Sequence, residues 1–339
     1  MTNTPSLFPQ PPDFERRKRQ PFLFETYYSS YIKWFESVMR PALKEGSVSN
    51  TEPKWLHLAW RAYASELFTV LALKYTAGES VEELRDQLAE IVQCHEQAAT
   101  AQREAEGDPH CSGVDLAYID DYVHYVGLLS LAILLHREDL IPRLHGLIAG
   151  SAFDKDDALV EELLTRYLRD RPYLDTFYHD EPYEPLLDAT AGDTPDEKLA
   201  DLKTYLKKWY GGMKGTGWYN AHKGMTDEGG GGYFGYWAWE AGAIAYLHGI
   251  DDSTINSMYY PKDLVAYARS VSPPPTDGSS SASSTLLRCE AGEPCPRSGF
   301  WTSPAYTGGR RQFQQGEIMP EIEGNSWGAT FWYFDEAGQ

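Results

Sequence analysis

The sequence is poor in positive charge. Thirty lysines and arginines stand against fifty aspartates and glutamates in 339 residues, giving a formal net charge of −20 with neutral histidines. A chain this acidic repels the phosphates of nucleic acids and of anionic membranes, so we expect neither as a partner. It attracts basic partners instead. Two interpretations follow: a generically acidic surface, or a surface built to capture something cationic.

Cysteines and long apolar runs are also scarce. Four cysteines are too few for a scaffold held together by disulfides. Cys289 and Cys295 could pair or bind a metal, but they form half a zinc site at best, so we expect two reduced thiols. No apolar run reaches about 18 residues, so no membrane helix is expected. The first residues do not read as a secretory signal, and a cytoplasmic location is the expectation.

Familiar catalytic and cofactor motifs are missing. The sequence contains no GxSxG, no HExxH and no dinucleotide-binding fingerprint. The glycine-rich segment 211–217 lacks the ending of a phosphate loop and follows a helical pattern, so we interpret it as a helix-terminating turn. The acidic run 154–157 lacks the glycine and the later glutamate of a calcium loop. We therefore predict no metal and no cofactor.

Helical patterns dominate the first 270 residues, with apolar side chains recurring every three or four positions. The stretch 234–249 is apolar nearly all round, which predicts a helix buried on every side. We predict a mainly α fold, a multi-helix bundle of packed helical hairpins with a small β-rich C-terminal appendage. The other predicted helices cover residues 22–44, 55–75, 80–106, 115–137, 140–149, 154–168 and 196–210, with a short closing helix that begins at Pro261.

Changes in composition divide the chain into five segments. Residues 1–20 read as a proline-rich, disordered leader, and residues 271–285 as a serine- and proline-rich linker. Between them we expect an N-terminal helical domain over 21–150 and a C-terminal helical domain over 151–270. Residues 286–339 form the expected β-rich tail, which includes a strand in GATFWYFDE.

Glu240 is the most unusual ionisable residue, because it lies among tryptophans in the apolar stretch. A carboxylate in such surroundings must be paired or have a raised pKa, and it could serve as a general acid. It lacks a second carboxylate or a nucleophile at a fixed spacing, so a structural hydrogen-bonding role is favoured. His248, in the same stretch, reads as a satisfied core histidine. An enzyme would use Glu240 with His222 in an aromatic pocket.

Three motifs resemble a known family. They are WYGGMKGTGWYNAHKG (209–224), YFGYWAWEAGAIAYLHGIDDSTI (233–255) and YYPKDLVAYAR (259–269). Their order resembles the C-terminal domain of PoNe immunity proteins (PoNi). The helices over about 20–150 resemble the N-terminal domain of the same family, by position and helical character. The tail resembles a β-rich tail of several type VI secretion immunity proteins. The fingerprint residues are Trp209, Trp218, Tyr236, Trp237, Trp239 and Glu240, expected as a core framework.

The resemblance implies an immunity protein, not an enzyme, that neutralises a co-encoded antibacterial toxin. The toxins of this family are DNases of the PD-(D/E)xK superfamily delivered between bacteria by type VI secretion. An acidic inhibitor is the electrostatic complement of a basic nuclease domain, and opposite charge accelerates association. The expected partner is the cognate effector toxin. A plain interaction adaptor with no toxin is a further alternative.

The working surface is expected in the acidic region just before the fingerprint. Charge alone gives affinity without specificity, so aromatic anchors should lie inside that region. The predicted toxin-binding residues are Asp154, Asp156, Asp157, Glu161, Glu162, Tyr178, Asp180, Glu181, Tyr183, Glu184 and Asp188.

Overall fold

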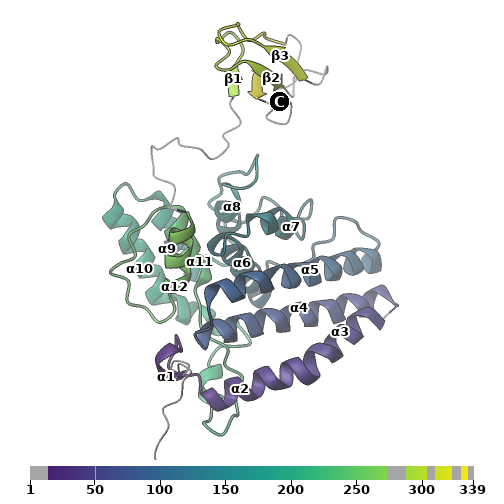
Figure 1. Cartoon of the computed structure of the whole chain (residues 1–339), viewed down its shortest axis with the longest axis vertical. Helices are drawn as coiled ribbons and strands as arrows, with labels where there is room; N and C mark the ends of the chain where they lie inside the picture. Colours follow the sequence, from purple (N-terminus) through teal and green to yellow (C-terminus); the bar gives the residue numbers. More distant parts are fainter. Residues whose placement is uncertain (1–13, 50, 273–287, 304–309, 323–329, 335–339) are drawn as a thin grey trace, which may run out of the picture. The chain divides into compact units, whose positions relative to one another are not determined.

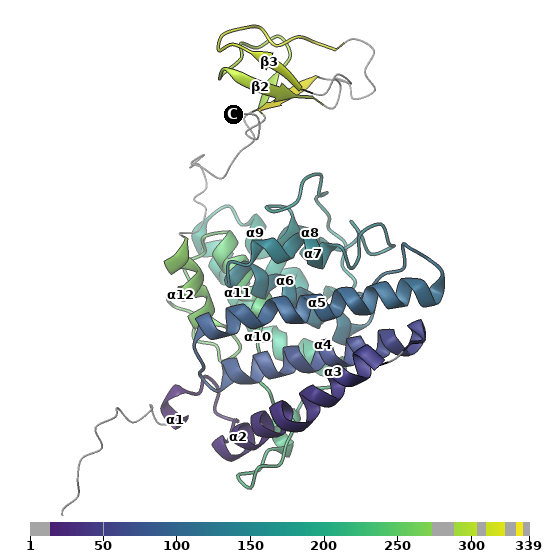
Figure 2. The same ribbon diagram turned by 45° about the vertical axis from the view of Figure 1, so that its right-hand side comes forward.

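The structure is a computed structural model that describes residues 14–49, 51–272, 288–303, 310–322 and 330–334. The chain divides into two compact units, Met1–Thr276 and Asp277–Gln339. The first consists of helices and the second contains a four-stranded sheet (Figures 1 and 2). The predicted fold class, mainly α with a small β-rich appendage, is confirmed. The division of the helical unit at residue 150 stays a prediction, and most of the predicted linker lies outside the described residues.

The end of the predicted leader is folded. Helix α1 (Phe14–Arg17) buries Phe14, and Arg19 and Gln20 bind the helical unit. The Arg19 guanidinium donates to the carbonyl of Tyr75, and the Gln20 amide donates to the carbonyl of Tyr236. The expectation of disorder was therefore wrong for residues 14–20, because polar side chains there satisfy buried backbone groups that composition does not reveal.

Long helices form one side of the helical unit. Helix α2 (Glu25–Trp34) continues through a π-helical turn (Phe35–Met39) into α3 (Arg40–Ser49). Helices α4 (Pro53–Thr76) and α5 (Val81–Glu106) pack as a hairpin beside them (Figure 1). The Ser80 hydroxyl caps α5 by accepting from the Glu83 N–H, as its position in the sequence predicts.

Two apolar helices form the centre of the core. Helix α6 (Ile119–Leu134) is buried without interruption from Tyr125 onward, and every residue of α11 (Trp239–Leu247) is buried. The two pack against each other. A Cβ at Gly127 would lie 3.2 Å from both Phe68 and Trp239, so glycine permits this close approach. The predicted burial of 234–249 is confirmed, although α6 begins four residues and α11 five residues later than the helices predicted at 115–137 and 234–249.

Shorter helices cover this core. They are α7 (Ile141–His145), α8 (Ala158–Leu164), α9 (Asp180–Ala191), α10 (Pro195–Gly212) and α12 (Lys262–Val271). Helix α9 was not predicted, because two prolines suggested coil. Glu181 is non-helical, so Pro182 opens the regular part of α9, where its missing N–H costs no helical bond, whereas Pro185 lies inside the helix. Helices α9 and α10 form a hairpin.

The small unit contains an antiparallel sheet in the order β1-β4-β2-β3. The strands are β1 (Arg288–Glu290), β2 (Gly299–Thr302), β3 (Arg310–Phe313) and β4 (Phe331–Phe334). Strand β4 confirms the strand predicted in GATFWYFDE. Cys289 and Cys295 lie in the core of this unit with Trp301 and Trp332, and their thiols donate to backbone carbonyls. In the described part of the chain no helix is long and apolar enough to cross a membrane.

Candidate functional site

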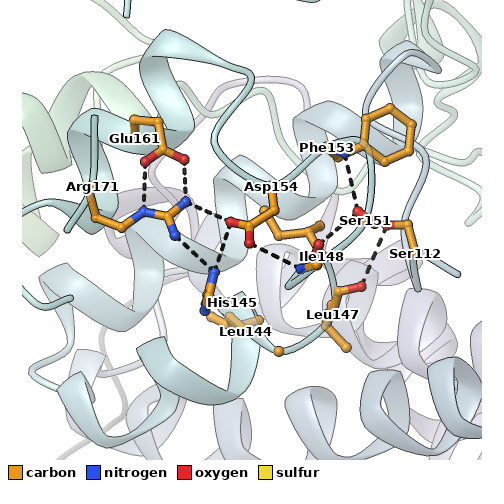
Figure 3. A network of polar contacts seen from close by, with 12 residues as sticks. Ser112, Leu144, His145, Leu147, Ile148, Ser151, Phe153, Asp154, Glu161 and Arg171 are labelled. Carbon is orange, nitrogen blue, oxygen red and sulfur yellow. Dashed lines mark hydrogen bonds and ion pairs between the residues drawn. The ribbon is translucent and has the colours of Figure 1, made fainter. Parts of the chain in front are cut away.

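Two carboxylates of the first half of the predicted acidic region, Asp154 and Glu161, pair with one arginine (Figure 3). The Arg171 side chain is 3% exposed and pairs with both oxygens of Glu161, itself 2% exposed. Its Nη2 also donates to Asp154 over 2.9 Å, and His145 Nε2 lies 3.0 Å from the same carboxylate. Burial opposes ionisation of Asp154, but the Gly150 N–H, His145 and Arg171 outweigh it and lower the pKa to about 2. This cluster is an internal ion-pair network.

Asp157 is buried and holds the start of α8. Its Oδ1 accepts from the Val160 N–H and the Tyr122 hydroxyl, both over 3.0 Å, and its Oδ2 accepts from the Tyr178 N–H. Burial raises the pKa of Asp157 in spite of these donors. Tyr183 is buried too, beside Tyr122. Asp157, Glu161 and Tyr183 are therefore enclosed by the fold, and their predicted contact with a partner stays a prediction.

Three other predicted residues are partly buried and already have partners. Glu162 pairs with His248 over 2.8 Å, which also makes His248 the satisfied histidine that was predicted. The Tyr178 hydroxyl donates to Asp156 over 2.5 Å. Asp154 belongs to the Arg171 network. The remaining predicted residues are exposed: Asp156, Asp180, Glu181, Glu184 and Asp188.

The second half of the region is a continuous exposed run of negative charge. Residues 172–197 contain eight carboxylates and no lysine or arginine, and all eight carboxylates are exposed. Burial, followed by the charges of Asp188 and Glu197, raises the pKa of Asp201, so charges of α9 and α10 act on one another across the hairpin. We name the eight residues the acidic hairpin: Asp175, Asp180, Glu181, Glu184, Asp188, Asp193, Asp196 and Glu197.

Half of the residues of the acidic hairpin were not predicted from the sequence as toxin-binding residues. Asp175, Asp193, Asp196 and Glu197 were not among the predicted contacts. The signal that identifies them is the absence of any lysine or arginine over 172–197, which was available in the sequence. Glu197 also completes a capping box with Thr194 at the start of α10, so its carboxylate has a structural task as well.

Glu240 is enclosed in the aromatic core of α10 and α11. Its Oε1 accepts from the Tyr205 hydroxyl over 2.5 Å and from the Trp209 indole N–H over 2.8 Å. Burial raises the pKa of Glu240 to about 7, although both donors lower it. His222 instead binds the Tyr236 hydroxyl over 2.8 Å. No interaction among the described residues joins Glu240 to His222.

The fingerprint tryptophans fall into two groups. Trp209 and Trp218 stack with ring centres 5.8 Å apart, and Trp237 and Trp239 lie side by side at 5.6 Å, both against Tyr75. Of these, Trp218, Trp237 and Trp239 also border a cavity of about 300 Å³ between α4, α6 and residues 217–239. Among the described residues no group of three or more histidine, cysteine or carboxylate side chains is placed to hold a metal.

Comparisons place this arrangement among known proteins. Residues 155–264 match the family model described as PoNe immunity proteins (PoNi), C-terminal. For this similarity we call residues 155–264 the PoNi domain. This domain includes the acidic hairpin, Glu240 and all the fingerprint residues, so the resemblance seen in the three motifs is confirmed. The match supports an immunity role for the chain.

The fold extends beyond the PoNi domain. A crystal structure of protein PA2201 from Pseudomonas aeruginosa is similar with a TM-score of 0.57 and 22% identity, covering 73% of this chain and 88% of that one. At this identity the likeness shows a shared fold. No curated protein matches the chain.

Proposed function

We propose that this chain is an immunity protein that binds the DNA-cleaving domain of a cognate antibacterial effector, a PoNe-type DNase delivered by type VI secretion, and covers its DNA-binding surface. The observation that carries the proposal is the acidic hairpin, which lies inside the PoNi domain. A nuclease must present cationic side chains to the phosphate backbone of DNA. Eight exposed carboxylates without an intervening lysine or arginine complement such a surface.

We expect the acidic hairpin to raise the rate at which the chain associates with the toxin. Oppositely charged surfaces accelerate association above the neutral range of about 10⁵–10⁶ M⁻¹s⁻¹. An inhibitor of a DNase gains from fast capture, because every delay leaves the chromosome exposed to cleavage. The Arg171 network is not assigned to this capture, since Arg171 and Glu161 are buried and paired within the fold.

The test compares two fourfold neutralised variants by their association rate with the toxin encoded by the neighbouring gene. The hairpin variant changes Asp180, Glu181, Glu184 and Asp188 to the matching amides. The control variant removes the same number of exposed charges from α5, at Glu82, Asp86, Glu104 and Glu106. Both variants have the same net charge, so any difference reports where the charge lies.

We expect the hairpin variant to associate about tenfold more slowly at low ionic strength and to show a weaker salt dependence than the control. Cells that coexpress the toxin with the hairpin variant should lose viability sooner. Equal rates for the two variants would place the contact elsewhere. Failure of the wild-type chain to bind the toxin or to protect cells would refute the function itself.

One observation favours a second candidate, an immunity factor that enzymatically reverses a toxin's modification. A carboxyl group with a pKa near 7 is suited to general acid catalysis, and Glu240 has one. His222, its proposed partner in that chemistry, binds Tyr236 instead. Glu240→Gln separates the two functions: lost protection with unchanged toxin binding supports the enzyme, and retained protection supports the inhibitor.

A further inference from the structure

The cavity beside the fingerprint tryptophans is a built pocket. Helix α4 contributes Ser65, Phe68 and Thr69, and residues 217–239 contribute Trp218 and Trp239 among others. Its volume of about 300 Å³ equals that of on the order of ten water molecules. This volume accommodates one long side chain. The pocket joins the PoNi domain to the helices that precede it.

Gly235 fixes one side of the pocket. Its φ of +118° lies in the region that favours glycine, and a Cβ there would lie 2.1 Å from the Thr76 hydroxyl oxygen and 2.4 Å from the Trp237 indole nitrogen. The Trp237 indole N–H in turn donates to the Thr76 hydroxyl over 2.8 Å. The aromatic wall is therefore held in place by backbone geometry and by a buried hydrogen bond.

The ionisable groups of the pocket are two carboxylates, one guanidinium and two histidines. Asp121 is neutralised by Arg61, whose Nη2 lies 2.5 Å from Oδ1 and 2.7 Å from Oδ2. Asp120 accepts from the Gly217 N–H over 3.0 Å, next to Trp218, and has no basic side-chain partner among the residues that the structure describes. Asp120 is thus the carboxylate whose charge remains unbalanced.

The histidines add no positive charge. His95 Nε2 lies 3.0 Å from His124 Nε2, an arrangement in which one ring donates and the other accepts. Burial, with Arg61 nearby, lowers the pKa of His95 to about 4, and burial together with His95 lowers the pKa of His124. With both rings neutral at pH 7, the pocket carries one net negative charge among aromatic rings.

We propose that this pocket receives one basic side chain, a lysine or an arginine, from the toxin. Asp120 would pair with the cation, and the rings of Trp218 and Trp239 would contact its alkyl stem and its charge. The proposal rests on the proposed function and adds an anchor to it. Binding energy at protein interfaces concentrates in a few residues that fill enclosed pockets. A charge-matched pocket supplies selectivity that a broad acidic surface lacks.

Two pairs of variants test the pocket, with affinity for the toxin encoded by the neighbouring gene as the measurement. Ser65→Arg introduces a basic side chain at the pocket from the chain itself. Its control, Ala62→Arg, adds the same charge at an exposed position of α4 outside the pocket. Asp120→Asn removes the unbalanced charge and keeps an acceptor for Gly217. Asp86→Asn removes one charge from an aspartate that is 84% exposed.

We expect Ser65→Arg and Asp120→Asn to weaken toxin binding about tenfold or more relative to their controls. Circular dichroism of each variant tests whether it is folded. If Asp120→Asn does not fold, Ser65→Arg still tests the pocket, because Ser65 is exposed. Equal affinities within both pairs would overturn the pocket and leave the immunity function standing. A wild-type chain that fails to bind the toxin would overturn both.

A second experiment identifies the chemistry of the occupant. Capped arginine, capped lysine and capped norleucine amides are used to displace the toxin from the wild-type chain. We expect the two cationic amides to compete and the neutral one to fail, and the competition to disappear in Asp120→Asn. Competition by norleucine equal to that by lysine would show that the pocket selects apolar bulk and would contradict the proposal.

Discussion

Glu240 makes the stability of the helical unit depend on pH in an unusual direction. Its pKa rises from an ordinary 4.5 to about 7 in the folded chain, because burial costs more than the bonds from Tyr205 and Trp209 return. The folded state therefore holds a proton at this site over a pH range in which the unfolded state has released it. The stabilisation that protonated Glu240 contributes is fully present below about pH 4.5 and is lost as the pH rises through about 7.

The size of the effect follows from the two pKa values. Each pH unit between them corresponds to about 1.4 kcal/mol, so deprotonation of Glu240 costs the fold about 3 kcal/mol by pH 7.5. Glu240→Gln does not titrate and keeps an oxygen that can accept from both donors. The free energy of unfolding of the wild type minus that of Glu240→Gln should therefore fall by about 3 kcal/mol between pH 4.5 and pH 7.5.

Urea denaturation followed by tryptophan fluorescence at a series of pH values measures this difference, and other titrating groups cancel because both proteins share them. Glu181→Gln, at an exposed carboxylate, reports what the loss of one surface charge does. A difference between wild type and Glu240→Gln that stays constant within about 1 kcal/mol over this pH range would refute the reasoning. It would mean that Glu240 is ionised in both states.

Two further substitutions probe the framework. Arg171→Met leaves Glu161 as an unpaired buried charge and should destabilise the helical unit by about 3–5 kcal/mol in urea titrations. A loss of less than about 1 kcal/mol would mean that the network is open to water. Gly235→Ala forces a Cβ against the Thr76 hydroxyl at a positive φ. We expect it to lower the free energy of unfolding by about 2 kcal/mol or more and to lower the melting temperature. An unchanged melting temperature would mean that the backbone rearranges without strain.

The sequence predicted the helices well where burial alone decides them. The segment that became α11 is apolar nearly all round and the one that became α6 is largely apolar after its first turns, and at this length such stretches favour a buried helix. Helix α9 was missed because Pro182 opens its regular part, where a proline costs no hydrogen bond, and composition alone cannot tell such a proline from a helix breaker. The family resemblance depended on local motifs and was therefore visible without any structure.

The candidate surface was only half predictable. Asp157 and Glu161 read as solvated charges from their sequence neighbours, yet they are buried by partners far along the chain, Tyr122 and Arg171. Burial of a carboxylate depends on donors that the fold brings to it, and local sequence does not name those donors. The acidic hairpin escaped this problem because residues 172–197 contain no lysine or arginine that could neutralise it locally.

In the proposed complex, the acidic hairpin determines mainly how fast the two proteins associate, and the pocket determines mainly how long the complex lasts. Exposed charges act over about 8 Å at physiological salt, so they guide many basic proteins equally and change mainly the association rate. A pocket that encloses one cation acts only after contact, and its loss changes mainly the dissociation rate. Hairpin variants should therefore slow association with little change in dissociation, while Asp120→Asn should leave association nearly unchanged and shorten the complex's lifetime. If both sets of variants changed only association, the pocket would be one more surface charge, and the specificity of the complex would have to come from elsewhere.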